Sequence, residues 1–234
     1  MNESTLSIKQ LADMLRQDAR DLEKMASRGY LPARRVGGEW TFATAEIHEW
    51  LEKRLPDYSD DELSRLDSSH APSNDLLVCS MLAQDSIELD LHARTRTSML
   101  HEMVKIAERS WQIWDPQALL ASLREREQRS TTAVANGVAF PHPARRLPDA
   151  LGESVVAFAR MAEPLNLGAA DNRPTDLVFM VACRNDATHL QVLARLSRLI
   201  MREELMDALR VATSPHAIWD LLAEAERAIQ TTQQ

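Results

Sequence analysis

The feature that most constrains this sequence of 234 residues is the alternation of strand-length and helical patterns after residue 86. Residues 87–92 alternate apolar and polar side chains, as a strand with one buried face does. Apolar runs of strand length follow at 153–160 and 176–183. Helical patterns occupy about 97–109, 115–129, 187–200, 202–211 and 215–228. Interleaved elements of this kind predict an α+β or α/β fold in which helices flank a sheet.

The first 55 residues predict a small domain of their own. Helical patterns lie at about 7–15, 19–27 and 44–55, and Ser7 is placed to cap the first of them. Between the second and third helices, Gly37-Gly38 suits the tight turn of a hairpin. The pattern therefore predicts three helices and a two-stranded hairpin.

A polar segment separates the two regions. Residues 56–74 are acidic and rich in Ser and Pro, which is the composition of a linker, with one short helix expected near 60–66. The sequence thus predicts a domain at 1–55, a linker at 56–74 and a second domain at 75–230.

Charge and cysteine content exclude several classes of protein. The formal net charge is −8, so any contact with DNA must come from a local basic patch. Cys79 and Cys183 lie in apolar surroundings without metal-ligand spacing, and we interpret both as buried reduced thiols. We expect no metal site and no cofactor. No leader-like or membrane-spanning pattern is present, so we expect a cytoplasmic protein.

Two histidines are the main candidates for chemistry. His142 follows Pro141 at the end of a short apolar run, where a strand end would hold its ring in place. Neutral imidazole is nucleophilic near physiological pH, which suits a phosphoryl acceptor. His189 falls in the first turn of a predicted helix, with Asp186 or Thr188 as the cap, and a helix start attracts anions. Taken singly, each could also be an ordinary surface histidine, but together they could face each other across a phosphate.

A longer motif surrounds these residues. Residues 126–142 read REQRSTTAVANGVAFPH, and His189-Leu190 and Leu193-Ala194-Arg195-Leu196 follow downstream. In order and spacing this pattern resembles the fructose/mannitol/nitrogen-regulatory class of phosphotransferase-system IIA domains. The resemblance covers about residues 75–228.

The resemblance implies a mixed β-sheet flanked by helices and a phosphohistidine carrier rather than a classical turnover enzyme. His142 matches the histidine that accepts a phosphoryl group from an HPr-type phosphocarrier, and His189 matches the second active-site histidine, which stabilises that group. Arg126 matches an arginine that would supply positive charge to phosphate oxygens. Thr132 matches a motif threonine whose hydroxyl would donate a hydrogen bond.

Three residues depart from the family pattern. Ala133 and Ala135 stand where the family has glycines, and alanine tolerates positive backbone angles poorly, so a different turn geometry is expected. Pro143 follows the histidine where the family has a small residue, and proline lacks the backbone N–H. Arg145 and Arg146 add positive charge close by. The sequence leaves open whether these departures abolish phosphorylation.

The N-terminal region carries a second resemblance, to the excisionase/MerR-like helix-turn-helix domains, which are small winged units that bind DNA. It covers residues 5–55 and implies that the helix at about 19–28 enters the major groove while the hairpin at 34–40 acts as the wing. The candidate DNA-binding residues are Arg20, Lys24, Arg28, Arg34 and Arg35. Acidic residues lie on or beside the same helix and similar folds also bind proteins, so a protein-binding module is the alternative.

Together these features predict a regulatory IIA-like protein in which phosphorylation of His142 alters what a helix-turn-helix module binds. The alternatives are a plain phosphocarrier that passes phosphate to a IIB-type sugar-transport partner, and an interaction scaffold that is not phosphorylated. A homodimer stays open as well, because helix-turn-helix proteins often read two half-sites.

Overall fold

The computed structural model describes residues 5–67 and 76–231. The chain divides into two compact units, which we call the N-terminal unit (Met1–Ser73) and the C-terminal unit (Asn74–Gln234). Among the described residues, no helix has both the length and the apolar content needed to span a bilayer.

The N-terminal unit combines helices with a small antiparallel sheet. Its first six elements are β1 (Thr5–Ser7), α1 (Ile8–Leu15), α2 (Ala19–Ser27), β2 (Arg34–Val36), β3 (Glu39–Ala43) and α3 (Thr44–Arg54). The sheet has the order β1-β3-β2, and both pairings are antiparallel. The predicted cap is present, because Ser7 accepts a hydrogen bond from the backbone N–H of Gln10 and forms a capping box with it. Gly37 and Gly38 adopt positive φ angles of 61° and 89°, as the predicted hairpin turn requires.

The first part of the predicted linker is folded. A 3-10 turn (Leu55–Asp57) is followed by α4 (Asp60–Asp67), which corresponds to the short helix expected near residues 60–66. α4 contacts α1, and Leu63 and Leu66 are buried. Burial of these apolar side chains therefore makes α4 part of the folded N-terminal unit. The rest of the predicted linker, residues 68–74, lies outside the described residues.

The C-terminal unit contains a four-stranded sheet with helices on both sides. Its elements are a 3-10 turn (Gln84–Ser86), β4 (Ile87–Leu91), α5 (Arg96–Glu108), α6 (Pro116–Arg129), β5 (Val138–Ala139), β6 (Val155–Leu165), β7 (Thr175–Ala182), α7 (Asp186–Ile200), α8 (Glu203–Val211) and α9 (Pro215–Thr231). The strand order is β4-β6-β7-β5. The central pair, β6 and β7, is antiparallel, whereas β4 pairs with β6 and β5 with β7 in parallel. The prediction of a mixed sheet flanked by helices is confirmed.

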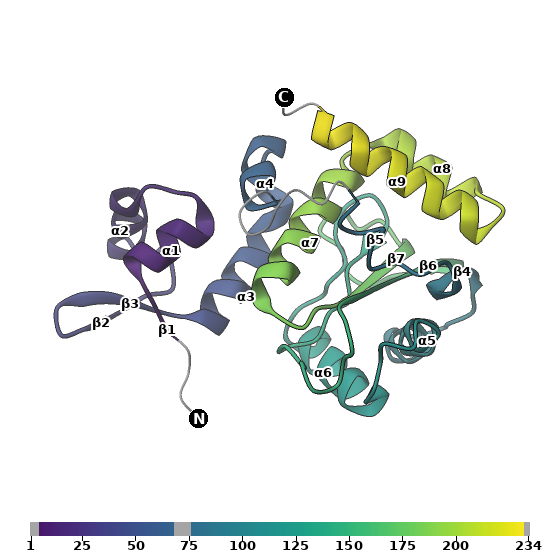
Figure 1. Ribbon diagram of the computed structural model, residues 1–234, viewed down its shortest axis with the longest axis horizontal. Coiled ribbons are helices and arrows are strands. Elements are labelled where there is room, and N and C mark those ends of the chain that lie inside the picture. The colour runs from purple at the N-terminus through teal and green to yellow at the C-terminus, as the bar shows by residue number, and fades with distance from the viewer. Residues whose placement is uncertain (1–4, 68–75, 232–234) are drawn as a thin grey trace. The chain divides into compact units, whose positions relative to one another are not determined.

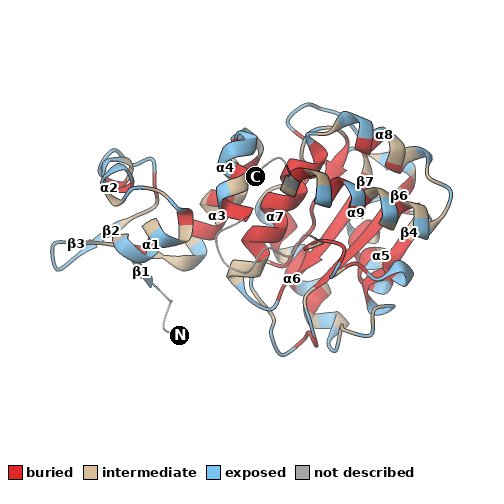
Figure 2. Cartoon of the chain, turned by 45° about the horizontal axis from the view of Figure 1, so that its top comes forward, coloured by how far each residue is buried: buried red, intermediate tan, exposed pale blue. Residues whose placement is uncertain are grey.

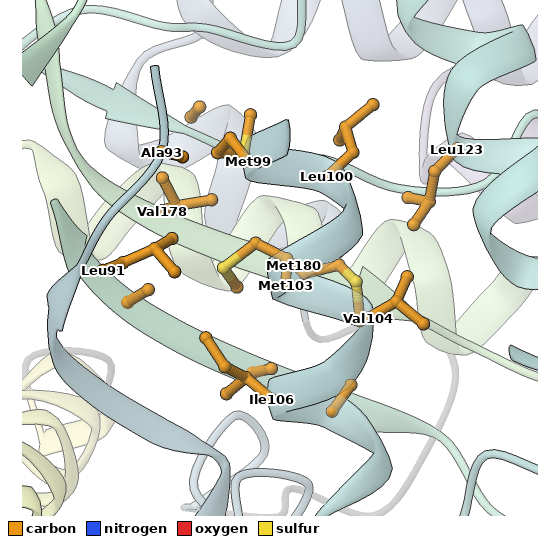
Figure 3. Packing of buried hydrophobic residues seen from close by; sticks show 14 of the residues in the cluster. Leu91, Ala93, Met99, Leu100, Met103, Val104, Ile106, Leu123, Val178 and Met180 are labelled. Atoms are coloured by element: carbon orange, nitrogen blue, oxygen red, sulfur yellow. The ribbon is translucent and has the colours of Figure 1, made fainter. Parts of the chain in front are cut away.

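The sheet is covered on both faces. On one face, Met103 and Val104 of α5 pack in a cluster with Val178 and Met180 of β7 (Figure 3). The next residue along β7, Phe179, points to the other face, where its ring lies 4.9 Å from that of Phe158. This explains why the first half of β6 and all of β7 read as largely apolar runs rather than alternating ones, and why these parts of the sheet are mostly buried in Figure 2.

Buried polar contacts hold the C-terminal helices in place. The Glu226 carboxylate on α9 accepts hydrogen bonds from the backbone N–H groups of Val78 and Cys79, both at 2.9 Å. It also pairs with Arg195 of α7 at 2.9 Å. These contacts join α7 and α9 to the start of the unit, and α7 is the helix that carries His189 at its first turn.

Candidate functional site

Between α6 and His142 the chain forms a short hairpin-like loop. The backbone N–H of Phe140 donates to the Thr132 carbonyl at 3.0 Å, so the outgoing and returning segments lie side by side. The loop turns at Asn136 and Gly137, whose φ angles are 65° and 74°. Finally, the N–H of Val181 donates to the Pro141 carbonyl at 2.9 Å, which ties the residue before His142 to β7.

The turn explains how alanines are accommodated in this motif. Neither Ala133 nor Ala135 is among the described residues with positive φ. The left-handed angles fall instead on Asn136 and Gly137, residue types that tolerate them. The two alanines are therefore free of left-handed strain, and the expected difference in turn geometry stays a prediction.

Hydrogen bonds to both ring nitrogens define the state of the His142 imidazole. The Arg126 Nε–H group donates to Nε2 of His142 at 3.0 Å, and Nδ1 lies 2.7 Å from the Phe140 carbonyl oxygen. A guanidinium can only donate, so Nε2 must be an unprotonated acceptor. Nδ1 then carries the proton and donates it to the carbonyl. The ring is thus held as a neutral tautomer whose lone pair sits on Nε2.

His189 comes from the start of α7 and meets His142. The two ring centroids are 4.9 Å apart with an interplanar angle of 61°. Neither predicted cap of this helix, Asp186 or Thr188, is correct. Asn185 is the N-cap, and its side chain accepts a hydrogen bond from the backbone N–H of Thr188 at 2.8 Å, while Asp186 begins the helix. His189 still lies in the first turn, so the expected meeting of a strand-end and a helix-start histidine is what the structure shows.

Thr132 has a different partner from the one expected. Its hydroxyl donates to the Glu127 carboxylate at 2.6 Å, and its backbone N–H donates to the same carboxylate at 3.2 Å. The hydroxyl hydrogen is therefore used inside the turn rather than offered to a phosphate. Sequence reasoning missed Glu127, although an acid directly after Arg126 on a helix end was a signal that could have drawn attention to it.

The two arginines that follow His142 both have acidic neighbours. Arg145 pairs with Glu125 at 2.8 Å, and Arg146 pairs with Asp186 at 3.2 Å. Arg146 also donates to the Pro143 carbonyl at 3.4 Å. Their positive charge is therefore partly balanced within the unit, and Arg146 links the acceptor segment to the start of α7.

The candidate DNA-binding residues are exposed, and most have local partners. Arg20 and Lys24 lie on α2, where Lys24 pairs with Asp21 at 2.8 Å, and Arg28 follows the helix as its C-cap. In the hairpin, Arg34 pairs with Glu46, and the Arg35 guanidinium lies 4.7 Å from the Trp40 ring centroid. Acidic partners thus reduce the positive charge at two of the five positions.

Fold and site define a class: a helix-turn-helix unit followed by a mixed-sheet unit that brings two histidines and an arginine together. Residues 5–55 match the model of a helix-turn-helix domain, and residues 80–225 match the model described as "Phosphoenolpyruvate-dependent sugar phosphotransferase system, EIIA 2". The second match covers more than half of the chain. The chain therefore belongs to the type 2 EIIA family of the phosphotransferase system.

Individual relatives agree with this assignment. The chain is 35% identical over 149 residues to the fructose-specific EIIA component of Haloferax volcanii, which covers 63% of this chain and 95% of that protein. It is 30% identical over 152 residues to the fructose-specific EIIABC component of Bacillus subtilis, where the match spans 64% of this chain but only 24% of the larger protein. The crystal structure of the nitrogen regulatory protein IIA-Ntr from Neisseria meningitidis superposes with a TM-score of 0.57 at 26% identity, covering 62% of this chain and 99% of that one.

Proposed function

We propose that the C-terminal unit accepts a phosphoryl group on Nε2 of His142 from an HPr-type phosphocarrier. The observation that carries this proposal is the pair of hydrogen bonds on the His142 ring, from Arg126 to Nε2 and from Nδ1 to the Phe140 carbonyl. They present an unprotonated, nucleophilic nitrogen next to a permanent cation. Membership of the EIIA family makes phosphoryl transfer the matching chemistry.

The transfer is a substitution at phosphorus. The Nε2 lone pair of His142 forms a new N–P bond while the N–P bond to the donor's histidine breaks, and the bonding pair leaves with the donor ring. No proton needs to move on the acceptor, because the proton on Nδ1 stays hydrogen-bonded to the Phe140 carbonyl. That carbonyl stabilises the positive charge which the ring gains when Nε2 is substituted.

Arg126 and His189 are placed to stabilise the transferred group. The Arg126 guanidinium occupies the Nε2 lone pair before transfer, so it must shift from the nitrogen to the phosphoryl oxygens as the N–P bond forms. His189 faces the acceptor ring from the first turn of α7, where the helix dipole also favours an anion. Such positioning and charge stabilisation carry most of phosphoryl-transfer catalysis.

The test is incubation of the full chain with phosphoenolpyruvate, enzyme I and HPr, followed by intact-mass measurement. We expect one added phosphoryl group in the wild type and none in H142A. The variant H101A is the matched control, because His101 is an exposed histidine on α5, and it should gain phosphate as the wild type does. Absence of any gain in the wild type with several HPr-type donors would contradict the proposal and favour a scaffold.

We further propose that the N-terminal unit binds DNA and that phosphorylation of His142 alters this binding. The helix-turn-helix match and the exposed cations of α2 and the hairpin support it. Mobility-shift assays with genomic fragments should show binding that weakens in R20A and R28A, because both would remove phosphate or base contacts. Absence of DNA binding in both phosphorylation states, together with capture of a specific protein, would instead assign the unit to protein recognition.

A second candidate function is a phosphocarrier that discharges to a IIB-type partner. Similarity to a fructose-specific EIIA component over 95% of that protein favours it. Phosphorylated protein mixed with the IIB domains of the source genome should then lose its added mass to one of them. If no IIB domain accepts the phosphoryl group, this candidate function is excluded and the proposed regulatory role is favoured.

A further inference from the structure

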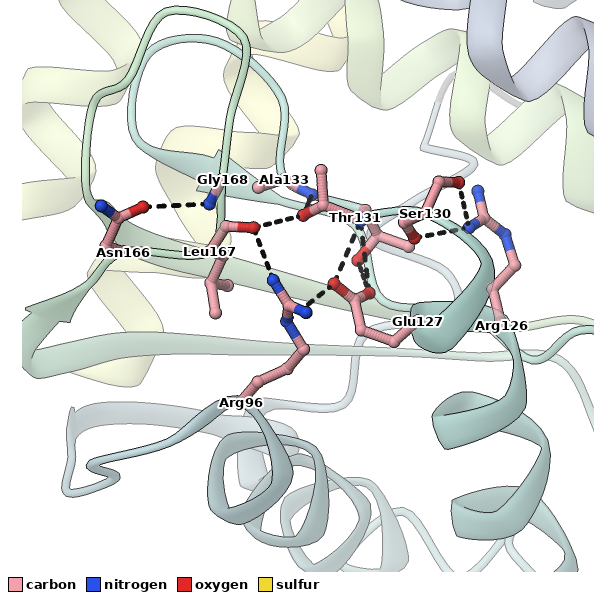
Figure 4. Close-up of polar contacts among 10 residues, drawn as sticks. Arg96, Arg126, Glu127, Ser130, Thr131, Ala133, Asn166, Leu167 and Gly168 are labelled. Atoms are coloured by element: carbon pink, nitrogen blue, oxygen red, sulfur yellow. Dashed lines mark hydrogen bonds and ion pairs between the residues drawn. The ribbon is translucent and has the colours of Figure 1, made fainter.

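The end of α6 carries two adjacent charged residues that serve different contacts. Arg126 reaches His142, while Glu127, rotated by about 100° around the helix axis, reaches Thr132 in the turn that follows. In Figure 4 the Glu127 carboxylate lies between the Arg96 guanidinium and the turn at Ser130 and Thr131. The region beside the proposed acceptor therefore contains a second polar network that the transfer chemistry does not use.

The Glu127 carboxylate is buried and depends on charged and polar partners. Its side chain is 3% exposed, and it accepts the hydroxyl of Thr132 at 2.6 Å. Arg96, on the first turn of α5, supplies the opposite charge at 3.3 Å. Since a buried carboxylate is costly without a counter-charge, the ion pair with Arg96 compensates for the burial of Glu127 together with the two hydrogen bonds from Thr132.

Arg96 also connects this network to a third segment. Its Nη2 group donates to the Leu167 carbonyl at 2.7 Å, and the Thr131 hydroxyl donates to the same oxygen, again at 2.7 Å. The turn after α6 is thus held from two sides, by Glu127 and by the loop between β6 and β7. Arg96 contacts both of these groups, the Glu127 carboxylate and the Leu167 carbonyl.

The same turn holds the guanidinium of Arg126. Its Nη1 group donates to the Ser130 carbonyl at 3.0 Å and to the Ser130 hydroxyl at 3.2 Å. A shift of the turn would move these acceptors, and the Arg126 Nε–H would then leave its line to Nε2 of His142. The position of the Arg126 guanidinium therefore depends on the position of the turn.

We infer that Glu127 is a positioning residue for the phosphoryl site and that Arg96 supplies the charge that keeps Glu127 in place. This inference rests on the proposed phosphorylation of His142. Without Arg96, the Glu127 carboxylate loses its counter-charge and the Leu167 carbonyl loses one of its donors, so both groups that hold the turn around Arg126 are less firmly fixed. Glu127 and Arg96 act through the turn, not by contact with the phosphate.

The first experiment is a double-mutant cycle on phosphorylation rate, with R96Q, E127Q and the double variant, measured by intact mass with phosphoenolpyruvate, enzyme I and HPr. We expect each single change to slow phosphate gain about tenfold to a hundredfold, as misplacement of a catalytic group does. The double variant should be no slower than the slower single variant, because both changes break one interaction. Unchanged rates in both single variants, or effects that multiply, would overturn the inference.

Two controls separate positioning from general destabilisation. R94Q changes an exposed arginine two residues earlier and should keep the wild-type rate. V104A removes a buried side chain from the same helix and should lower thermal stability without slowing phosphorylation. A V104A variant as slow as R96Q would show that only overall stability matters, which contradicts a positioning role.

The second experiment needs no phosphorylation. In uniformly ¹⁵N-labelled full-length protein, the hydrogen bond from Arg126 to His142 should give a measurable scalar coupling between its two nitrogens. We expect R96Q and E127Q to weaken or abolish this coupling and R94Q to retain it. If the wild type accepts no phosphate from any donor, the proposed function fails while this measurement still decides the positioning role. An unchanged coupling in R96Q and E127Q overturns it.

Discussion

Substituting Gly137 by alanine tests how the turn before β5 is packed, and the same substitution at Gly168 is the control. Gly137 has a φ of 74°, and an added Cβ would lie 2.8 Å from Oδ1 of Asp176 and 3.1 Å from the Pro174 carbonyl. Gly168 has a φ of 81° with nothing within 4 Å of that position. G137A and G168A therefore impose the same kind of left-handed backbone on alanine, but only G137A adds a clash.

The magnitude follows from two contributions. A left-handed angle costs alanine roughly 1–2 kcal/mol, offset by about 0.4–1 kcal/mol because alanine makes the unfolded chain less flexible. At Gly137 the Asp176 carboxylate must also move, although it pairs with Arg210 at 2.7 Å and both side chains are largely buried. Weakening hydrogen bonds between charged groups adds about 1.5–3 kcal/mol. We expect losses of about 1 kcal/mol for G168A and about 2–4 kcal/mol for G137A.

Thermal unfolding followed by calorimetry measures this difference. For a unit of this size the expected fall in Tm is about 2–4 °C for G168A and about 4–16 °C for G137A. In a D176A background the extra cost of G137A should shrink, because the crowding atom is gone. Equal Tm values for the two glycine variants would refute the argument that contact with Asp176, rather than backbone angle alone, requires glycine at this position.

Three further predictions concern the site, the thiols and the helical packing. R126Q should slow phosphorylation of His142 about tenfold to a hundredfold, because a charge-assisted hydrogen bond is lost, whereas R129Q, at an exposed position, should not. Burial raises the pKa of the Cys183 thiol to about 12. In alkaline solution the folded chain therefore keeps the thiol proton, whereas the unfolded chain loses it. The free energy of unfolding should therefore fall as pH rises above about 8.5. Between pH 7.5 and 10, the wild type should lose about 2 kcal/mol more than C183A. Urea unfolding of both proteins at both pH values measures this difference, and equal losses would contradict it. E226A should cost about 3–5 kcal/mol in urea unfolding because it removes the anion of a buried pair, while E224A, exposed on the same helix, should not, and equal midpoints would contradict this.

Local signals predicted most elements well because their causes are local. Ser7 caps α1 as expected, since a cap needs only the hydroxyl and the backbone N–H three residues later. The helix predicted at 115–129 is α6, with Asp115 as its cap. Asn185 was missed because three neighbouring residues can all cap a helix, and the backbone conformation decides among them.

The role of Thr132 shows where local reasoning ends. A hydroxyl in a motif can donate to a ligand or to the protein, and the choice depends on which acceptor the fold brings near it. Here the acceptor is Glu127, whose own position depends on Arg96 from another helix. The motif contains Glu127, but it holds no information on the contact of Glu127 with Arg96.

Features under short-range control can be read from the sequence. They are the two regions of different pattern, the helices and strands with their hydrophobic periods, the glycine turns, and the motif that identifies the IIA family. Tertiary structure decided the strand order β4-β6-β7-β5, the meeting of His142 with His189 at 4.9 Å, and the tautomer set by Arg126 and Phe140. The physical reason is that periodicity and capping depend on neighbours along the chain, whereas strand pairing and buried hydrogen bonds join groups that only packing brings together.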